Sequence, residues 1–68
     1  MTNAFRRQRE KAGLTQAEVA DAAAVIVTVI SKLENGHRRL LASEVKKYAR
    51  ILRCTPEELL EEEPSHAG

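Results

Sequence analysis

Apolar residues along this chain fall into short groups with helical spacing, separated by glycine, proline and capping residues. The most apolar group is AAAVIVTVI at residues 22–30, whose single polar member is Thr28. Its valines and isoleucines favour a β-strand, but apolar and polar residues do not alternate and the sequence offers no partner strand. The group is also about half as long as the ~20 residues that a membrane-spanning helix needs. The pattern therefore disfavours both a strand and a membrane span.

The wider spacing around this group indicates a helix instead. Ile26, Ile30 and Leu33 recur at i, i+4 and i+7, which places them on one helix face. Gly36 suits the left-handed position that commonly follows a helix. We therefore predict a helix of about residues 26–35.

Two further helices are predicted before it. Residues 4–12 form a basic helix that ends at Gly13. The sequence TQAEVADAA begins with Thr15 and has Glu18 three residues later, which is the pattern of a capping box. Its small apolar residues would let another helix approach closely. These are Val19, Ala20 and Ala23.

Two more helices are predicted after it. Residues 43–52 have an apolar stripe on one side and cations on the other. The stripe consists of Val45, Tyr48, Ala49 and Leu52, and the cations are Lys46, Lys47 and Arg50. In TPEELLEEE, Thr55 caps the last helix, Pro56 takes its first position and Glu58 completes a second capping box.

The length of the chain limits it to one domain. A chain of 68 residues buries a single small core. We therefore expect an all-α, compact five-helix domain at residues 1–63 and a flexible C-terminal tail at residues 64–68. The single cysteine, Cys54, excludes an internal disulfide and fits a reducing compartment.

Residues suited to catalysis are scarce. The two histidines are His37 and His66, and they are accompanied by no nucleophile–base set, metal-ligand spacing or glycine-rich phosphate loop. The glutamates near the C-terminus fit a solvated helix face better than acid–base catalysts. We expect no enzymatic activity, no cofactor and no metal.

Charge is unevenly distributed along the chain, although its formal net charge is only +1. Residues 1–53 hold all eleven basic residues and five acidic ones, a net charge of +6. Residues 54–68 hold five glutamates and no lysine or arginine, a net charge of −5. The basic part suggests a nucleic-acid partner, and the alternative is a solvated surface of mixed charge.

Two segments carry a specific spacing: LTQAEVA at residues 14–20 and VISKLENG at residues 29–36. Together with the final TPEELL, they resemble the helix-turn-helix of the phage-repressor and Cro family, also called the XRE family, over about residues 5–60. The resemblance implies a lambda-repressor-like fold whose third helix lies in the DNA major groove. It further implies a cytoplasmic transcriptional regulator, expected to be a repressor that binds double-stranded DNA as a homodimer.

The resemblance also assigns DNA contacts to individual residues. Val27, Thr28 and Lys32 fall at base-reading positions. Ser31 shares their outward face. The remaining contacts, to phosphates or to an edge base, are assigned to Gln16, Asn35, His37, Arg38 and Arg39. The alternatives are that Gln16 is a surface helix former and that the basic residues are only solvated.

Arg9 and Glu34 match a pair that forms an ion pair between the first and third helices in some members of the family. This pair would be structural rather than a DNA contact. The alternative is that Arg9 is a solvated arginine.

Four residues depart from the family pattern. Ala24 stands where a glycine is usual in the turn, and an L-residue there costs about 1 kcal/mol if the backbone is left-handed. Ile26 stands where a serine or threonine usually caps the third helix, and losing a cap costs ~1 kcal/mol. Val27 and Val29 stand at outward positions that are often polar, so an exposed apolar patch of Ile26, Val27 and Val29 is expected.

Three interpretations of this patch are open. In the first, the valines contact thymine methyl groups, while Thr28 and Lys32 supply hydrogen bonds to an A·T-rich site. In the second, the helix meets a protein, and the domain is an interaction module such as an antitoxin or an anti-repressor with weak DNA binding. In the third, the turn is shifted and Thr28 caps a shorter helix. We favour the first because the flanking basic residues are retained.

A homodimer is also suggested by the last helix. It offers Leu59 and Leu60 in a domain too small to need both in its core. The alternative is that both leucines close the core of their own chain.

Overall fold

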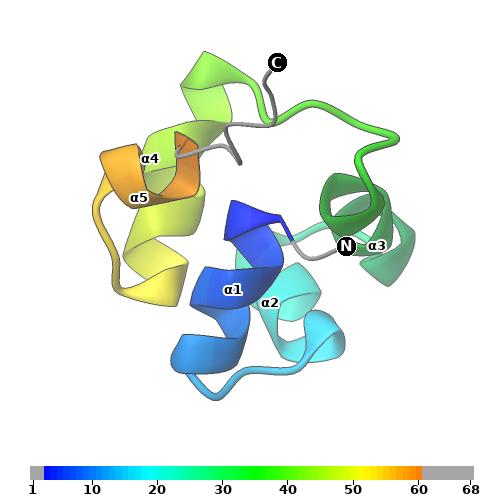
Figure 1. The fold of residues 1–68 in the computed structure, drawn as a ribbon. Helices are drawn as coiled ribbons and strands as arrows, with labels where there is room; N and C mark the ends of the chain where they lie inside the picture. Colours follow the sequence, from blue (N-terminus) through cyan, green and yellow to red (C-terminus); the bar gives the residue numbers. More distant parts are fainter. Residues whose placement is uncertain (1–2, 61–68) are drawn as a thin grey trace.

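The computed structural model describes residues 3–60 of the 68-residue chain. These residues form five helices and contain no strand, which confirms the predicted all-α class. In Figure 1, α4 and α5 lie on one side of α1 and α2, and α3 lies on the other. The helices are α1 (Ala4–Lys11), α2 (Gln16–Ala23), α3 (Val27–Asn35), α4 (Ala42–Leu52) and α5 (Pro56–Leu60).

Both predicted capping boxes form, and α3 and α4 begin within one residue of the predicted starts. Thr15 Oγ1 accepts a hydrogen bond from the Glu18 amide at 3.1 Å, and Glu18 Oε1 accepts one from the Thr15 amide at 2.8 Å. Thr55 and Glu58 repeat this reciprocal pattern at 3.2 and 2.8 Å. Each box satisfies two backbone donors that a helix N-terminus leaves without an intrahelical partner.

The core is built around three fully buried side chains, those of Val19, Ile30 and Tyr48. Phe5 meets Tyr48 edge-on, with ring centroids 5.2 Å apart and an interplanar angle of 70°. The two aromatic residues of the chain therefore pack against each other and join α1 to α4.

The small residues of α2 set the position of α3. Val19, Ala20 and Ala23 are all buried, as predicted. Their short side chains allow α2 and α3 to pack closely, and the two helices lie side by side in Figure 1.

The last helix divides its two leucines. Leu59 is buried in the core, whereas Leu60 is 54% exposed. The alternative in which both leucines close the core is therefore wrong for Leu60. Residues 61–63 and the predicted tail at 64–68 lie outside the described residues. No helix within residues 3–60 is long and apolar enough to cross a membrane.

Candidate nucleic-acid interface

The turn between α2 and α3 is built on a left-handed alanine. Ala24 has φ 61° and ψ 41°, which is the left-handed conformation expected at a position where glycine is usual. The Val25 amide donates to the Ala20 carbonyl at 3.0 Å, which closes the end of α2. The turn thus forms despite the Cβ of Ala24, whose left-handed conformation lowers the stability of the domain by about 1 kcal/mol.

Replacing Ala24 with glycine is expected to stabilise the domain by about 0.5 kcal/mol, because the relief of strain exceeds the added freedom of the unfolded chain. Ala22→Gly is the matched control, since Ala22 is exposed within α2 and the same change there costs roughly 1 kcal/mol. Urea unfolding of both variants measures the difference. Equal losses of stability would contradict a left-handed Ala24.

The start of α3 has no side-chain cap. Ile26 occupies the N-cap position with φ −79° and ψ 154°, and it makes no capping hydrogen bond. The helix begins at Val27, so the interpretation in which Thr28 caps a shorter helix is wrong. Ile26 is 69% exposed and Val27 is 44% exposed, and together they form an apolar patch.

Val29 corrects the predicted extent of this patch. Its side chain is half-buried and packs against the core cluster instead of pointing outward. The reason is that Val29 lies next to the buried Ile30, at the edge of the side of α3 that packs on the core. The apolar patch therefore consists of Ile26 and Val27 alone.

The two sides of α3 differ sharply in character. Ile30 and Leu33 are buried and anchor the helix to the core. Val27, Thr28 and Lys32 are exposed on the other side. Ser31 is half-buried at the edge of that side and lies 3.4 Å from the side-chain nitrogen of Asn35. An exposed helix face of this width fits the major groove of B-DNA.

A carboxylate inside the domain joins three helices. Arg9 Nε lies 2.6 Å from Glu34 Oε2, and Arg9 Nη2 lies 3.3 Å from Oε1. Both side chains are nearly buried, with 12% of the Arg9 side chain and 4% of the Glu34 side chain exposed. The hydrogen bond with Glu34 raises the pKa of Arg9 above its ordinary value. Arg9 therefore forms the ion pair with Glu34 and is not a solvated arginine.

The same carboxylate also fixes Gln16. Gln16 Nε2 donates to Glu34 Oε1 at 3.0 Å, while Arg9 Nη1 donates to the Leu14 carbonyl at 2.8 Å. Glu34 thereby connects α1, the start of α2 and the end of α3. At the other end of α1, Asn3 Nδ2 donates to the Leu33 carbonyl at 2.6 Å. The orientation of α3 is thus fixed by hydrogen bonds as well as by packing.

The connector between α3 and α4 contains a second ion pair, which the sequence interpretation missed. Arg38 Nη1 and Nη2 donate to the two carboxylate oxygens of Glu44 at 3.0 and 2.9 Å. Glu44 Oε1 also accepts the Leu41 amide at 3.1 Å, at the start of α4. The hydrogen bond from Arg38 lowers the pKa of Glu44. The sequence offered one sign of this contact. Glu44 stands three residues after Leu41 at the start of α4, and a glutamate in that position often folds back onto the preceding chain.

The residues assigned to DNA contact lie at the start of α2, on α3, and on the connector between α3 and α4. Val27, Thr28, Lys32 and Asn35 are exposed on α3, and His37 and Arg39 are exposed on the connector. Gln16 and Arg38 are half-buried, and each is hydrogen-bonded to a glutamate. Arg39 has no ion pair with any residue in the range 3–60.

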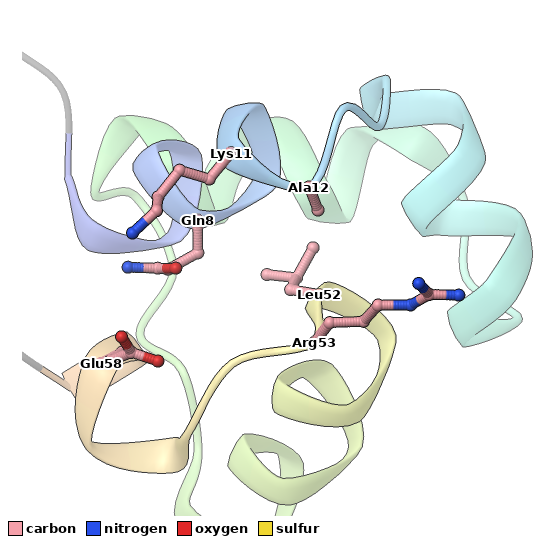
Figure 2. Close-up of a pocket in the computed structure, with 6 residues that line it drawn as sticks. All are labelled: Gln8, Lys11, Ala12, Leu52, Arg53 and Glu58. Carbon is pink, nitrogen blue, oxygen red and sulfur yellow. The ribbon is translucent and has the colours of Figure 1, made fainter.

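A shallow pocket lies away from this surface, between α1 and the α4–α5 junction. Figure 2 shows Lys11 and Gln8 on one side of it above Glu58, with Arg53 directed away from them. None of the residues assigned to DNA contact lines it. Within residues 3–60, no group of histidine, cysteine or acidic residues could hold a metal ion. The lining residues are Gln8, Lys11, Ala12, Leu52, Arg53 and Glu58.

The sequence was compared with protein families, with curated proteins and with solved structures. A family model described as helix-turn-helix matches residues 5–59, which is most of the chain. The matched range begins in α1, spans the turn and α3, and ends in α5. No curated protein and no solved structure matches the chain.

Proposed function

Because the chain belongs to the Cro/C1-type helix-turn-helix family, which consists of DNA-binding regulators, we propose that it is a sequence-specific transcriptional repressor. It acts in the cytoplasm as a homodimer on a two-fold operator, with α3 of each copy in the major groove. Two half-sites would then lie about one helical turn, ~34 Å, apart.

The observation that carries this proposal is the division of α3 into two sides. Ile30 and Leu33 hold the helix on the core, so the side chains of Thr28 and Lys32 extend from a fixed support. Residues near the start of such a helix reach base edges first. Thr28 and Lys32 would supply hydrogen bonds to base edges, and Val27 would contact a thymine methyl group in an A·T-rich site.

The surrounding polar residues supply contacts that carry no sequence information. Asn35, His37 and Arg39 are exposed at the end of α3 and on the connector, where they would contact phosphates. Gln16 would contact the backbone or an edge base from the start of α2, and Ser31 borders the groove surface. Arg38 is engaged by Glu44, so we assign it to holding the connector in place beside the phosphates.

Selection of bound duplexes from a random pool, followed by titration of one half-site duplex, tests the proposal. Lys32→Ala is expected to reduce discrimination against a changed base pair by about 10- to 100-fold, since one good base contact is worth ~1–3 kcal/mol. Arg39→Ala is expected to weaken all sequences alike and to lower the salt slope by about 1. Lys46→Ala is the control, because Lys46 lies on the outer face of α4.

A half-site titration avoids any effect of dimerisation on affinity. If Lys32→Ala and Lys46→Ala bind every duplex equally well, α3 does not read the groove. Steep weakening of the wild-type complex with added salt is expected as lysines and arginines release counterions.

The exposed patch of Ile26 and Val27 favours a second candidate function, that of an interaction module for a protein antagonist or toxin. Under this alternative, the random pool yields no duplex at low salt. A pull-down would then recover one protein with the wild-type chain and lose it with Ile26→Ser. Ile26→Ser also supplies a capping hydroxyl, so its fold would be retained.

A further inference from the structure

The pocket between α1 and the α4–α5 junction is lined mainly by polar side chains that the proposed DNA contact does not use. Its volume is about 350 Å³, at the small end of the range of ~300–1,000 Å³ that is typical of small-molecule sites. A pocket of this size takes a small ligand, and the side chains around it indicate which chemistry that ligand would need.

Gln8 presents an amide to the pocket without a protein partner. The residue is only 7% exposed, and its side chain makes no hydrogen bond with any residue in the range 3–60. Figure 2 shows the amide between the side chains of Lys11 and Glu58. A largely buried amide without a partner lowers stability, so packing of the domain does not account for a glutamine here. The amide has donors and an acceptor to offer to a molecule in the pocket.

Lys11 and Glu58 place opposite charges on the two sides of the same pocket. The hydrogen bond from the Thr55 amide, and more weakly the charge of Lys11, lower the pKa of Glu58, so its carboxylate is ionised at neutral pH. No ion pair joins the two side chains across the pocket. Glu58 Oε1 accepts the Thr55 amide at 2.8 Å, which leaves Oε2 to accept a hydrogen bond from a ligand.

These three side chains together complement a molecule that carries both charges. A simple anion would be attracted by Lys11 but repelled by Glu58, and a simple cation would meet the reverse. The carboxylate of a small zwitterion would accept hydrogen bonds from Lys11 Nζ and Gln8 Nε2, while its ammonium group would donate to Glu58 Oε2. Ala12 and Leu52 add an apolar wall for a short aliphatic side chain.

The junction that brings Glu58 to this pocket has an unfavourable backbone conformation. Arg53 ends α4 with φ 57° and ψ 47°, in the left-handed region that disfavours residues with a Cβ. Within residues 3–60, the other left-handed residue besides glycine is Ala24, in the helix-turn-helix turn. Such conformations cluster at functional sites. The Arg53 side chain is directed away from Gln8, Lys11 and Glu58, which leaves one cation and one anion facing the pocket (Figure 2).

We propose that this pocket binds a small zwitterion of the α-amino-acid class, with its carboxylate on Lys11 and Gln8 and its ammonium group on Glu58. The ligand would bridge α1 and α5, which already pack against each other, and would stabilise the folded chain by mass action. The pocket lies away from the surface proposed for DNA contact, so failure of either proposal leaves the other intact.

An NMR titration of the isotope-labelled full chain with L-valine tests this site, with L-alanine and L-leucine beside it to vary the side chain. Two probes are matched to L-valine: isovalerate lacks the ammonium group, and isobutylamine lacks the carboxylate. L-Valine is expected to give saturable shifts of the backbone amides of Gln8, Lys11, Arg53 and Glu58. Each matched probe is expected to bind at least about tenfold more weakly, because it loses a charge-assisted hydrogen bond.

Three variants each remove one contact with the ligand. Lys11→Met keeps the aliphatic stem, and Glu58→Gln keeps the capping box, in which glutamine also serves. Both are expected to weaken L-valine binding at least about tenfold. Gln8→Leu is expected to do the same while raising the midpoint of thermal unfolding, because it removes a largely buried amide without a partner. Lys46→Met is the control, since Lys46 lies on the outer face of α4.

The thermal midpoint separates a ligand contact from a structural role, because a glutamine that only supported the fold would lower the midpoint when replaced by leucine. The inference is overturned if none of the three amino acids gives saturable shifts, which would mean that the Gln8 amide is only solvated. It is equally overturned if isovalerate or isobutylamine binds as tightly as L-valine, or if Gln8→Leu leaves the affinity unchanged.

Discussion

Replacing Glu34 with alanine is expected to lower the free energy of unfolding by about 3–5 kcal/mol, since it leaves Arg9 nearly buried without its counterion. Arg9 Nε and Gln16 Nε2 would both lose the carboxylate oxygens that they contact at 2.6 and 3.0 Å. Urea unfolding followed by circular dichroism measures the loss. A domain of this size is stabilised by only roughly 5 kcal/mol, so the variant would keep at most about 2 kcal/mol of stability and would unfold at a much lower urea concentration.

Glu10→Ala is the matched control for this prediction. It removes the carboxylate of the Arg6–Glu10 pair, whose two side chains are 49% and 53% exposed. Surface pairs of this kind contribute about 0–1 kcal/mol. If Glu34→Ala were as mild as Glu10→Ala, the network around Glu34 would not hold the three helices together.

Replacing Ile30 with alanine is expected to cost about 2–5 kcal/mol, through lost burial and the cavity left behind. Ile30 is fully buried between α3 and the core. Ile30→Val, which is expected to cost about 0.5–1.5 kcal/mol, keeps the series measurable if the alanine variant does not fold. Thermal unfolding of both variants reports the change.

Val27 provides the contrasting substitution on the other side of the same helix. Val27→Ala is expected to change stability by less than about 0.5 kcal/mol, because the side chain is 44% exposed. It is instead expected to alter base preference at one position of the half-site, where a thymine methyl group would be contacted. A large loss of stability in Val27→Ala, or unchanged base preference, would contradict the proposed orientation of α3.

Local chemistry explains which parts of the fold could be predicted from the sequence. Thr15 with Glu18, and Thr55 with Glu58, act within three residues of each other, so their capping boxes can be read directly from the sequence. The left-handed Ala24 was expected instead from the family resemblance, because a glycine is usual at this position of the turn. The five helices and the buried side of α3 were predicted by the same kind of short-range pattern.

The features that escaped prediction depend on how helices pack. Val29 is half-buried because it lies at the edge of the side of α3 that packs on the core, and the spacing of residues within the sequence does not decide how far that packing extends. Arg38 reaches Glu44 because the connector folds back to the start of α4, a path that no local pattern specifies. Leu60 and Leu59 are adjacent in sequence, and only the packing of α5 decides which of them is buried. The DNA contacts assigned to α3 and the connector remain predictions.

The hydrogen bond between Gln16 and Glu34 has a consequence for the energetics of recognition. A free glutamine side chain loses up to about 1.5–2 kcal/mol of rotational entropy when it becomes ordered. Gln16 is already held at 3.0 Å by Glu34 while the domain is unbound, so most of this entropy is lost during folding. At the proposed interface, complex formation would not lose it again, and the start of α2 would meet DNA already ordered.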